Sequence, residues 1–187
     1  MRSWLGVDVG GRRKGFDVAL VDERRVALLA GGLDATGVVQ VVAEWTPAVV
    51  AIDGPRGCAE PGATTRDGEK ELARAVCGIR WTPDEATVRS HPLYGWVVEG
   101  LALFAALADA GPELVEVFPT ASFTRWIGSR NGEARARWTT RGIDGLGLDG
   151  VPPRTNQDQR DAIAAAVTAR QYARGETERF GTIEVPR

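Results

Sequence analysis

The chain has 187 residues and a formal net charge of −2, with 43% hydrophobic and 26% charged residues. This length fits one domain with a substantial core, and the composition excludes a fibrous or disordered chain. The slightly acidic balance argues against a protein that coats nucleic acid through a uniformly basic surface, although it is compatible with a local basic patch. No apolar run approaches the roughly 18 residues of a membrane-spanning helix. We therefore expect a cytoplasmic protein without a membrane partner.

The first part of the chain reads as strands joined by tight turns. Apolar runs at 3–9, 16–21 and 25–30 predict a three-stranded meander, whose turns are GGRRKG and DERR. Apolar residues at helical spacing after Asp34 then predict a helix that ends at Pro47. The run AVVAID, which follows, predicts a buried strand.

The middle of the chain is rich in Gly, Pro, Thr and charged residues. We expect mostly loop there, with one short helix at about 67–77. A broad apolar stripe predicts a longer helix over 93–110, and ELVEVFP predicts a second buried strand that ends at Pro119.

The last part of the chain is mainly helical. A short helix is expected at 120–128, and a weak one at 134–138 lies within an arginine-rich, glycine-rich segment. A strong helix begins after Thr155 or Asn156 and ends before Gly175. The tail GTIEVP could add an edge strand.

This order of elements predicts an α/β protein. A meander followed by alternating strands and helices favours a mixed five-stranded sheet with helices on both faces. We expect a single domain over 1–187, with a helical and loop insert at about 56–110. The two cysteines, Cys58 and Cys77, have neither disulfide nor zinc-site spacing.

Several acidic residues sit among apolar neighbours in these elements. A lone carboxylate there is costly unless it is paired, hydrogen-bonded or bound to a cation. If the first and fourth strands are adjacent and parallel, their acids converge, and Mg²⁺ or Mn²⁺ would relieve the repulsion. Two such ions about 4 Å apart stabilise both the attacking water and the leaving oxygen in phosphodiester hydrolysis. The candidate catalytic residues are Asp8, Asp53, Glu116, Asp158 and Asp161, and the candidate metal ligands are Asp8, Asp53 and Asp161.

Each of these acids also has a structural interpretation. Asp8 could accept backbone hydrogen bonds at the turn, and Asp53 could form an Asx turn before Gly-Pro. Glu116 could pair with an arginine across the sheet. Asp158 could be the first-turn acid of a helix cap.

Contacts to the substrate are expected from glycines and cations. Gly10 and Gly11 leave space for a phosphate, and the three cations after them would face it. The arginine-rich stretch at 125–142 is interleaved with Trp126 and Trp138, as in single-strand binders, or it is a solvated loop with core tryptophans. The candidate substrate-binding residues are Gly10, Gly11, Arg12, Arg13, Lys14, Arg137 and Arg141.

Four segments, in their order and spacing, resemble the domain of unknown function 429 family, which is regarded as a family of predicted nucleases with a ribonuclease H-like fold. They are GVDVGGRRKGFDVAL, VVAIDGP, VEVFPTASF and DQRDAIAAAVTA, and the similarity extends from Leu5 to about Pro186. The resemblance implies a ribonuclease H-like sheet and a metal-dependent nuclease. By position, it assigns the family's acids to Asp8, Asp53, Glu116, Asp158 and Asp161.

The resemblance also covers TRDGEKELARAVCGIRWTP, with Arg66 and Glu69 in place, and it adds Arg66 to the candidate substrate contacts. The chain departs from the family pattern at several positions. Gly68 stands where a cysteine is usual, and an arginine replaces a common lysine. That arginine is Arg135, Arg137 or Arg141, and Gln159 and Arg160 are polar where apolar residues are usual.

The leading hypothesis is a divalent-metal-dependent nuclease that hydrolyses phosphodiester bonds in nucleic acid. The alternative is a non-catalytic nucleic-acid or nucleotide-binding or regulatory module on the same fold. An actin-like or sugar-kinase-like phosphotransferase is disfavoured, because those enzymes need two copies of the fold and a second glycine-rich phosphate loop. The sequence leaves open the choice between DNA and RNA and the oligomeric state, with a homodimer as one option.

Overall fold

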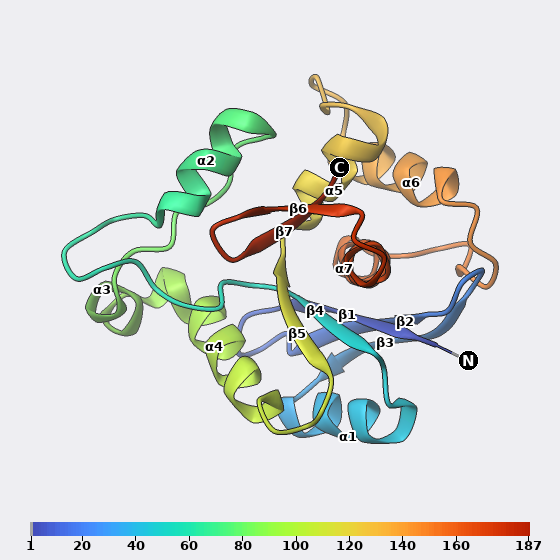
Figure 1. The fold of residues 1–187 in the computed structure, drawn as a ribbon, viewed down its shortest axis with the longest axis horizontal. Helices are drawn as coiled ribbons and strands as arrows, with labels where there is room; N and C mark the ends of the chain where they lie inside the picture. Colours follow the sequence, from blue (N-terminus) through green and yellow to red (C-terminus); the bar gives the residue numbers. More distant parts are fainter. Residues whose placement is uncertain (1) are drawn as a thin grey trace.

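Seven strands form one mixed sheet in the computed structural model of the protein, which describes residues 2–187 (Figure 1). Their spatial order is β3-β2-β1-β4-β5-β7-β6. The strands are β1 (Trp4–Val9), β2 (Phe16–Val21), β3 (Val26–Leu33), β4 (Val49–Asp53), β5 (Glu113–Val117), β6 (Thr177–Phe180) and β7 (Ile183–Pro186). The helices are α1 (Ala35–Trp45), α2 (Asp67–Ala75), α3 (Glu85–Ser90), α4 (Gly95–Leu107), α5 (Pro119–Ile127), α6 (Arg135–Gly145) and α7 (Gln157–Ala173), and a 3-10 turn, η1 (Pro92–Tyr94), precedes α4.

β1 lies in the interior of the sheet and combines both kinds of pairing. It is antiparallel to β2 and parallel to β4, and β5 and β7 continue the parallel part. The carboxyl ends of β1 and β4 therefore meet at one edge of the sheet. At that edge Asp8 is in register with Asp53 on one side and with Asp17 on the other.

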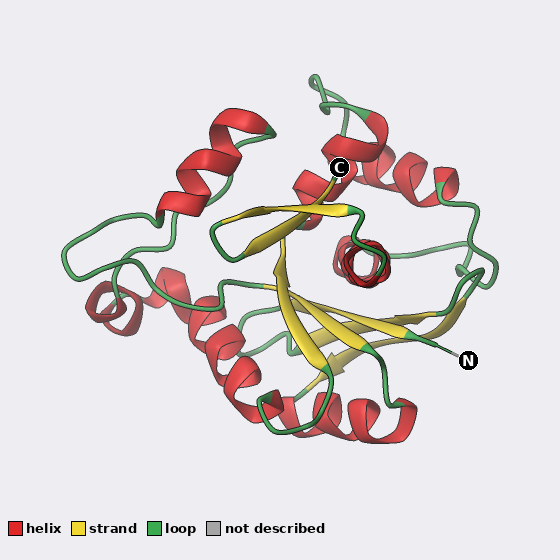
Figure 2. Cartoon of the chain, in the orientation of Figure 1, coloured by secondary structure: helices red, strands yellow, loops and turns green. Residues whose placement is uncertain are grey.

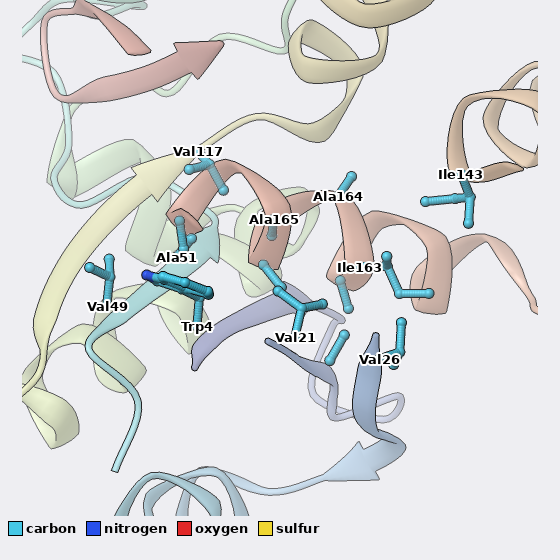
Figure 3. Packing of buried hydrophobic residues seen from close by; sticks show 14 of the residues in the cluster. Trp4, Val21, Val26, Val49, Ala51, Val117, Ile143, Ile163, Ala164 and Ala165 are labelled. Atoms are coloured by element: carbon cyan, nitrogen blue, oxygen red, sulfur yellow. The ribbon is translucent and has the colours of Figure 1, made fainter. Parts of the chain in front are cut away.

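Helices cover both faces of the sheet, as the sequence predicts (Figure 1). α7 lies on one face with α5 and α6, and α1 and α4 lie on the other. Figure 3 shows the face beneath α7, where Trp4, Ala51 and Val117 from the strands approach the Ala164–Ala165 region of the helix. A Cβ atom at Gly6 would come within 2.1 Å of the Ala162 carbonyl oxygen. The glycine is therefore required for α7 to lie this close to β1.

Local signals placed several elements correctly. Asp34 caps α1 by accepting a hydrogen bond from the Gly37 amide at 2.7 Å. Asn156 and Gln159 form a capping box at the start of α7. The short helix α3 was expected to be loop, and its N-cap is Asp84, which accepts a hydrogen bond from the Thr87 amide.

The expected number of five strands is wrong. The C-terminal tail forms a hairpin, and both of its strands join the sheet. Gly181, with a φ of +60°, makes the turn between them. β7 pairs with β5, and β6 becomes the edge strand in place of a single terminal strand. Each strand has only four residues and carries charges, of which Arg179 and Glu184 pair with each other, so the hydrophobic pattern is weak.

The segment between β4 and β5 contains α2, α3, η1 and α4, connected by extended loops (Figure 2). α4 packs against the sheet through Leu103, Phe104 and Leu107. α2 lies beside the C-terminal hairpin, where Gly68 allows close approach to Phe180. Within residues 2–187, no helix has both the length and the apolar character needed to cross a bilayer.

Candidate functional site

The centre of the site is the pair Asp8 and Asp53, at the ends of two parallel strands. The two residues are directly opposite each other in the β1–β4 ladder, so their side chains leave the sheet on the same face. That face is the one covered by α7, because Trp4 and Ala51 precede the acids by an even number of residues and pack beneath this helix. Asp8 is only 9% exposed.

The last helix adds two more carboxyl groups to this edge. Asp161 lies in the second turn of α7 and is 3% exposed, whereas Asp158 lies one turn earlier and is half-buried. Residues three apart share a helix face. The close contact of α7 with Gly6 therefore brings both acids toward Asp8.

The pKa shifts of these acids follow from their burial and their proximity to one another. Burial and then, in decreasing order of strength, the charges of Asp161, Asp158 and Asp17 together raise the pKa of Asp8 to about 8. Asp53 is only half-buried by surface area, but burial of its carboxyl group and the proximity of Asp8 raise its pKa well above the ordinary value. Like charges close together disfavour ionisation. Without a cation, Asp8 and Asp53 therefore stay protonated at pH values well above those at which an aspartate usually ionises.

Asp161 is better compensated than the pair on the strands. Burial raises its pKa to about 6, and the opposing effects of Arg135 and of a hydrogen bond from Gln157 limit the rise. Arg135 Nη2 lies 2.8 Å from Asp161 Oδ2, and Gln157 Nε2 donates to Asp161 Oδ1 at 2.9 Å. Both oxygens of this carboxylate are thus engaged by the chain itself.

A lysine on the β1–β2 turn forms an ion pair with the other acid of α7, Asp158. Lys14 Nζ lies 2.7 Å from Asp158 Oδ2. The side chains of Lys14 and Arg135 are 68% and 50% exposed. Lys14 can leave the partly exposed Asp158 at little cost, whereas Arg135 can leave the buried Asp161 only if another cation takes its place.

Glu116, the remaining candidate acid, is not part of this cluster. It pairs with Ile52 in the β4–β5 ladder, one position out of phase with Asp53, and therefore points to the opposite face of the sheet. There Arg66 binds both of its oxygens, through Nη2 at 2.6 Å and Nη1 at 2.9 Å. The interpretation of Glu116 as the partner of an arginine matches these contacts.

Arg66 is correspondingly occupied by carboxylates other than the aspartates. It also pairs with Glu69 at 2.9 Å, and its side chain is only 14% exposed. Glu116 further accepts a hydrogen bond from the backbone amide of Arg56 at 2.9 Å. This contact fixes the loop that leaves Asp53. The Arg66–Glu116 pair therefore supports the loop after Asp53, and both residues line a cavity of about 60 Å³ together with Asp53.

The predicted substrate contacts divide into turn residues and helix residues. Gly10 closes the β1–β2 turn, since its amide donates to the Gly15 carbonyl at 3.0 Å and a Cβ would lie 2.2 Å from that oxygen. Gly11 borders open space. A pocket of about 200 Å³ runs beside this turn, and Gly10, Gly11, Arg12, Arg13 and Lys14 line part of it.

On α6 the arginines are not equivalent. Arg135 reaches Asp161, whereas Arg141 pairs with Glu133 at 3.0 Å and Arg137 is exposed. The nearby tryptophans belong to the core. Trp138 is 2% exposed and donates to the Gly128 carbonyl, and Trp126 packs edge-on against Phe123. Trp138 is therefore not available to stack on bases, whereas Trp126 is partly exposed.

Sequence reasoning did not single out Asp17 or Gln157. Asp17 is in register with Asp8, and burial together with Asp158 raises its pKa. Alternation along β2 could have indicated it, because Ala19 and Val21 on the same face belong to the core beneath α7. A Cβ at Gly31 would lie 2.4 Å from Asp17 Oδ1. No sequence signal indicated the contact of Gln157.

The donor set has the chemistry of a site for a hard cation. It consists of carboxylates from β1, β4 and α7, and Mg²⁺ and Mn²⁺ prefer oxygen ligands. As the side chains stand, no group of three His, Cys, Asp or Glu residues within 2–187 is arranged to hold a metal ion. Arg135 and Lys14 engage the outer carboxylates instead. The oxygen donors therefore suit a divalent cation in kind, and to hold one the carboxylates would have to rearrange around it and displace Lys14 and Arg135.

The fold is similar to that of RuvC from Thermus thermophilus. Thermus thermophilus RuvC in complex with a Holliday junction substrate matches with a TM-score of 0.58 and 18% identity, over 94% of this chain and 96% of that chain. A Thermus thermophilus RuvC structure matches with a TM-score of 0.53 and 18% identity, over 99% of both chains. At this identity the similarity establishes the fold alone.

No curated protein matches the sequence. The model of one protein family, described as "Protein of unknown function (DUF429)", matches residues 6–184. The matched range contains every acid of the cluster and nearly all of the sheet. The chain therefore belongs to this family, as the four sequence segments predicted.

Proposed function

We propose that the protein is a divalent-metal-dependent nuclease that hydrolyses phosphodiester bonds. The observation that carries the proposal is the convergence of Asp8, Asp53 and Asp161 from three separate elements. Carboxyl groups that are buried together and lack full compensation are typical of sites that bind cations or transfer protons. All three are carboxylic acids, and oxygen ligands of this kind suit Mg²⁺ or Mn²⁺.

In this proposal Asp8, Asp53 and Asp161 hold Mg²⁺ or Mn²⁺, and Asp158 lies at the rim. The bound metal would activate a water molecule and stabilise the leaving oxygen. Lys14 and Arg135 release their carboxylates and bind phosphates of the substrate on either side of the cluster. Arg12 and Arg13, on the same turn as Lys14, extend this phosphate contact.

The structural neighbours support nucleic acid as the class of substrate. RuvC shares the fold over nearly its whole length, and one of its structures contains a Holliday junction substrate. The cations near the cluster, on the β1–β2 turn and on α6, are suited to a phosphate backbone. Whether the substrate is DNA or RNA, and whether it is branched, are questions for the assay.

The experiment compares cleavage of single-stranded, double-stranded and branched DNA and of RNA in Mg²⁺, Mn²⁺ or chelator. Cleavage with metal and none with chelator is expected. Asp8→Asn and Asp161→Asn should abolish it, whereas Asp109→Asn, an exposed acid outside the cluster, should leave it unchanged. Activity that survives in Asp8→Asn or in chelator would refute the proposal.

The ion pairs of Lys14 and Arg135 favour a second candidate. If these cations stay on Asp158 and Asp161, the protein would bind nucleic acid without cleaving it. The same substrates distinguish the two functions. Binding without turnover in every metal, and unchanged binding by Asp8→Asn, would favour the non-catalytic module.

A further inference from the structure

Gln157, the first residue of α7, connects the candidate site to a buried arginine. Its Nε2 donates to Asp161 Oδ1 at 2.9 Å. Its Oε1 accepts from Arg160 Nη2 at 3.2 Å, and the Thr139 hydroxyl, 3.1 Å away, shares its single proton between this oxygen and the Arg135 carbonyl. One amide group thus bridges a carboxylate and a guanidinium that lie on the same helix.

The two neighbours determine which way this amide points. A guanidinium has only donors, and an ionised carboxylate has only acceptors. With Oε1 toward Arg160 and Nε2 toward Asp161, each contact joins a donor to an acceptor. The reverse orientation would place two donors together on one side and two acceptors together on the other, so the orientation is unique.

Arg160 is an unusually firm anchor for the amide. It is 5% exposed, and among residues 2–187 it forms no salt bridge with a carboxylate. Its Nε donates to the Thr139 hydroxyl at 2.8 Å, and its Nη1 donates to the Thr155 carbonyl and hydroxyl. Neutral oxygens accept hydrogen bonds from all three nitrogens of the Arg160 guanidinium, so this side chain has little freedom to move. Its bond to Gln157 therefore also restricts the movement of the amide.

The opposite oxygen of Asp161 is held quite differently. Oδ2 is bound by Arg135, whose side chain is half exposed and can swing into solvent. We propose that Gln157 is a positioning residue, which keeps Asp161 Oδ1 fixed so that Oδ2 faces the cation when Arg135 leaves. The inference rests on the proposed metal site. It assigns a function to an amide that is neither a ligand nor a contact to substrate.

The test measures Mn²⁺ affinity of the full chain, by following free Mn²⁺ with electron paramagnetic resonance. Gln157→Met keeps the length of the side chain but removes both contacts. We expect its dissociation constant for Mn²⁺ to rise about tenfold or more, as is usual when a group that orients a metal ligand is removed. Gln157→Asn, one methylene too short to span the two neighbours, should weaken binding in the same way.

Gln159→Met is the matched control. Gln159 lies on the same turn, but its amide oxygen bonds only the Asn156 backbone amide. Its Mn²⁺ affinity should stay within about twofold of the wild type, because neither residue contacts Asp161. Thermal unfolding of all variants verifies that they fold.

The outcomes separate this inference from the nuclease proposal. Wild-type affinity in both Gln157 variants, or an equal loss in Gln159→Met, would overturn the role of Gln157. A wild-type protein that binds Mn²⁺ but cleaves no nucleic acid would refute the nuclease and leave the positioning role supported by the variants. A wild-type protein that binds no Mn²⁺ would overturn both.

Discussion

Lys14 Nζ lies 2.7 Å from Asp158 Oδ2, so the first turn of the sheet is tied to the first turn of the last helix. The two residues are 144 positions apart in sequence. The pair closes one side of the aspartate cluster. Because the lysine is largely exposed, the pair contributes at most about 1 kcal/mol to stability.

Lys14→Met should therefore weaken nucleic-acid binding more than it weakens the fold. If Lys14 leaves Asp158 for a substrate phosphate, its loss should reduce the dependence of log affinity on log salt by about one unit. The measurement is binding at several salt concentrations, with urea unfolding beside it. An unchanged salt dependence would show that Lys14 does not contact phosphate.

The metal-free protein should lose stability as pH rises from about 4 to about 8. The pKa of Asp8 is raised from 3.8 to about 8 and that of Asp161 to about 6. A carboxyl group with a raised pKa stabilises the fold below its unfolded pKa, and this stabilisation is lost as pH rises through the folded pKa. We expect a loss on the order of a few kcal/mol, measured by urea unfolding in chelator.

Asp8→Asn is the control for this pH dependence. The amide cannot ionise, so the variant should show a shallower decline and greater stability than the wild type at about pH 8. Wild-type stability that increases over the same range would contradict the assigned protonation of the cluster.

Mn²⁺ should raise the unfolding temperature of the wild type more at about pH 8 than at about pH 5.5. Cation binding requires ionised carboxylates, and protons compete for them. At a hundredfold excess over its dissociation constant, the ion would stabilise the fold by about 2.7 kcal/mol. Differential scanning calorimetry measures the shift. Asp8→Asn should show little of it, and an equal shift in this variant would place the ion elsewhere.

Glu116→Gln should lower stability and leave Mn²⁺ affinity within about threefold of the wild type. The substitution removes the charge that compensates Arg66, and breaking a buried ion pair costs about 3–5 kcal/mol. An ion held by Asp8, Asp53 and Asp161 would not contact Glu116, which lies on the other face of the sheet. Urea unfolding and Mn²⁺ titration together check both statements. A loss of metal binding in a folded variant would return Glu116 to the list of candidate ligands.

The convergence of Asp8 and Asp53 could be predicted because both end buried strands whose order along the chain favours parallel pairing. The position of Glu116 could not, since it depends on the register of β5 against β4. A register in which Glu116 and not Val117 faced Asp53 would have put its carboxyl group in the cluster. Nothing in the sequence indicates whether β5 is shifted by one residue against β4.

The sequence also does not predict which arginine of α6 contacts Asp161. Arg135, Arg137 and Arg141 all lie on one helix, and its rotation about its own axis decides which of them meets Asp161. That rotation is set by Trp138 and Ile143, which pack into the core beneath α7. The tail GTIEVP predicts one strand of the C-terminal hairpin, β7; β6 is not predicted, because short, charged strands depend on their neighbours for their conformation.

The contact between Gly6 and Ala162 also limits which substitutions the chemistry can tolerate. No side chain separates the backbone of β1 from that of α7 there, so the spacing between the two elements that carry Asp8 and Asp161 is set by the absence of a methyl group. Exchanging Gly6 for alanine would displace Asp161 relative to Asp8 without altering any acid. Inactive variants of this protein should thus arise from changes of one carbon atom in the core as readily as from loss of a carboxylate.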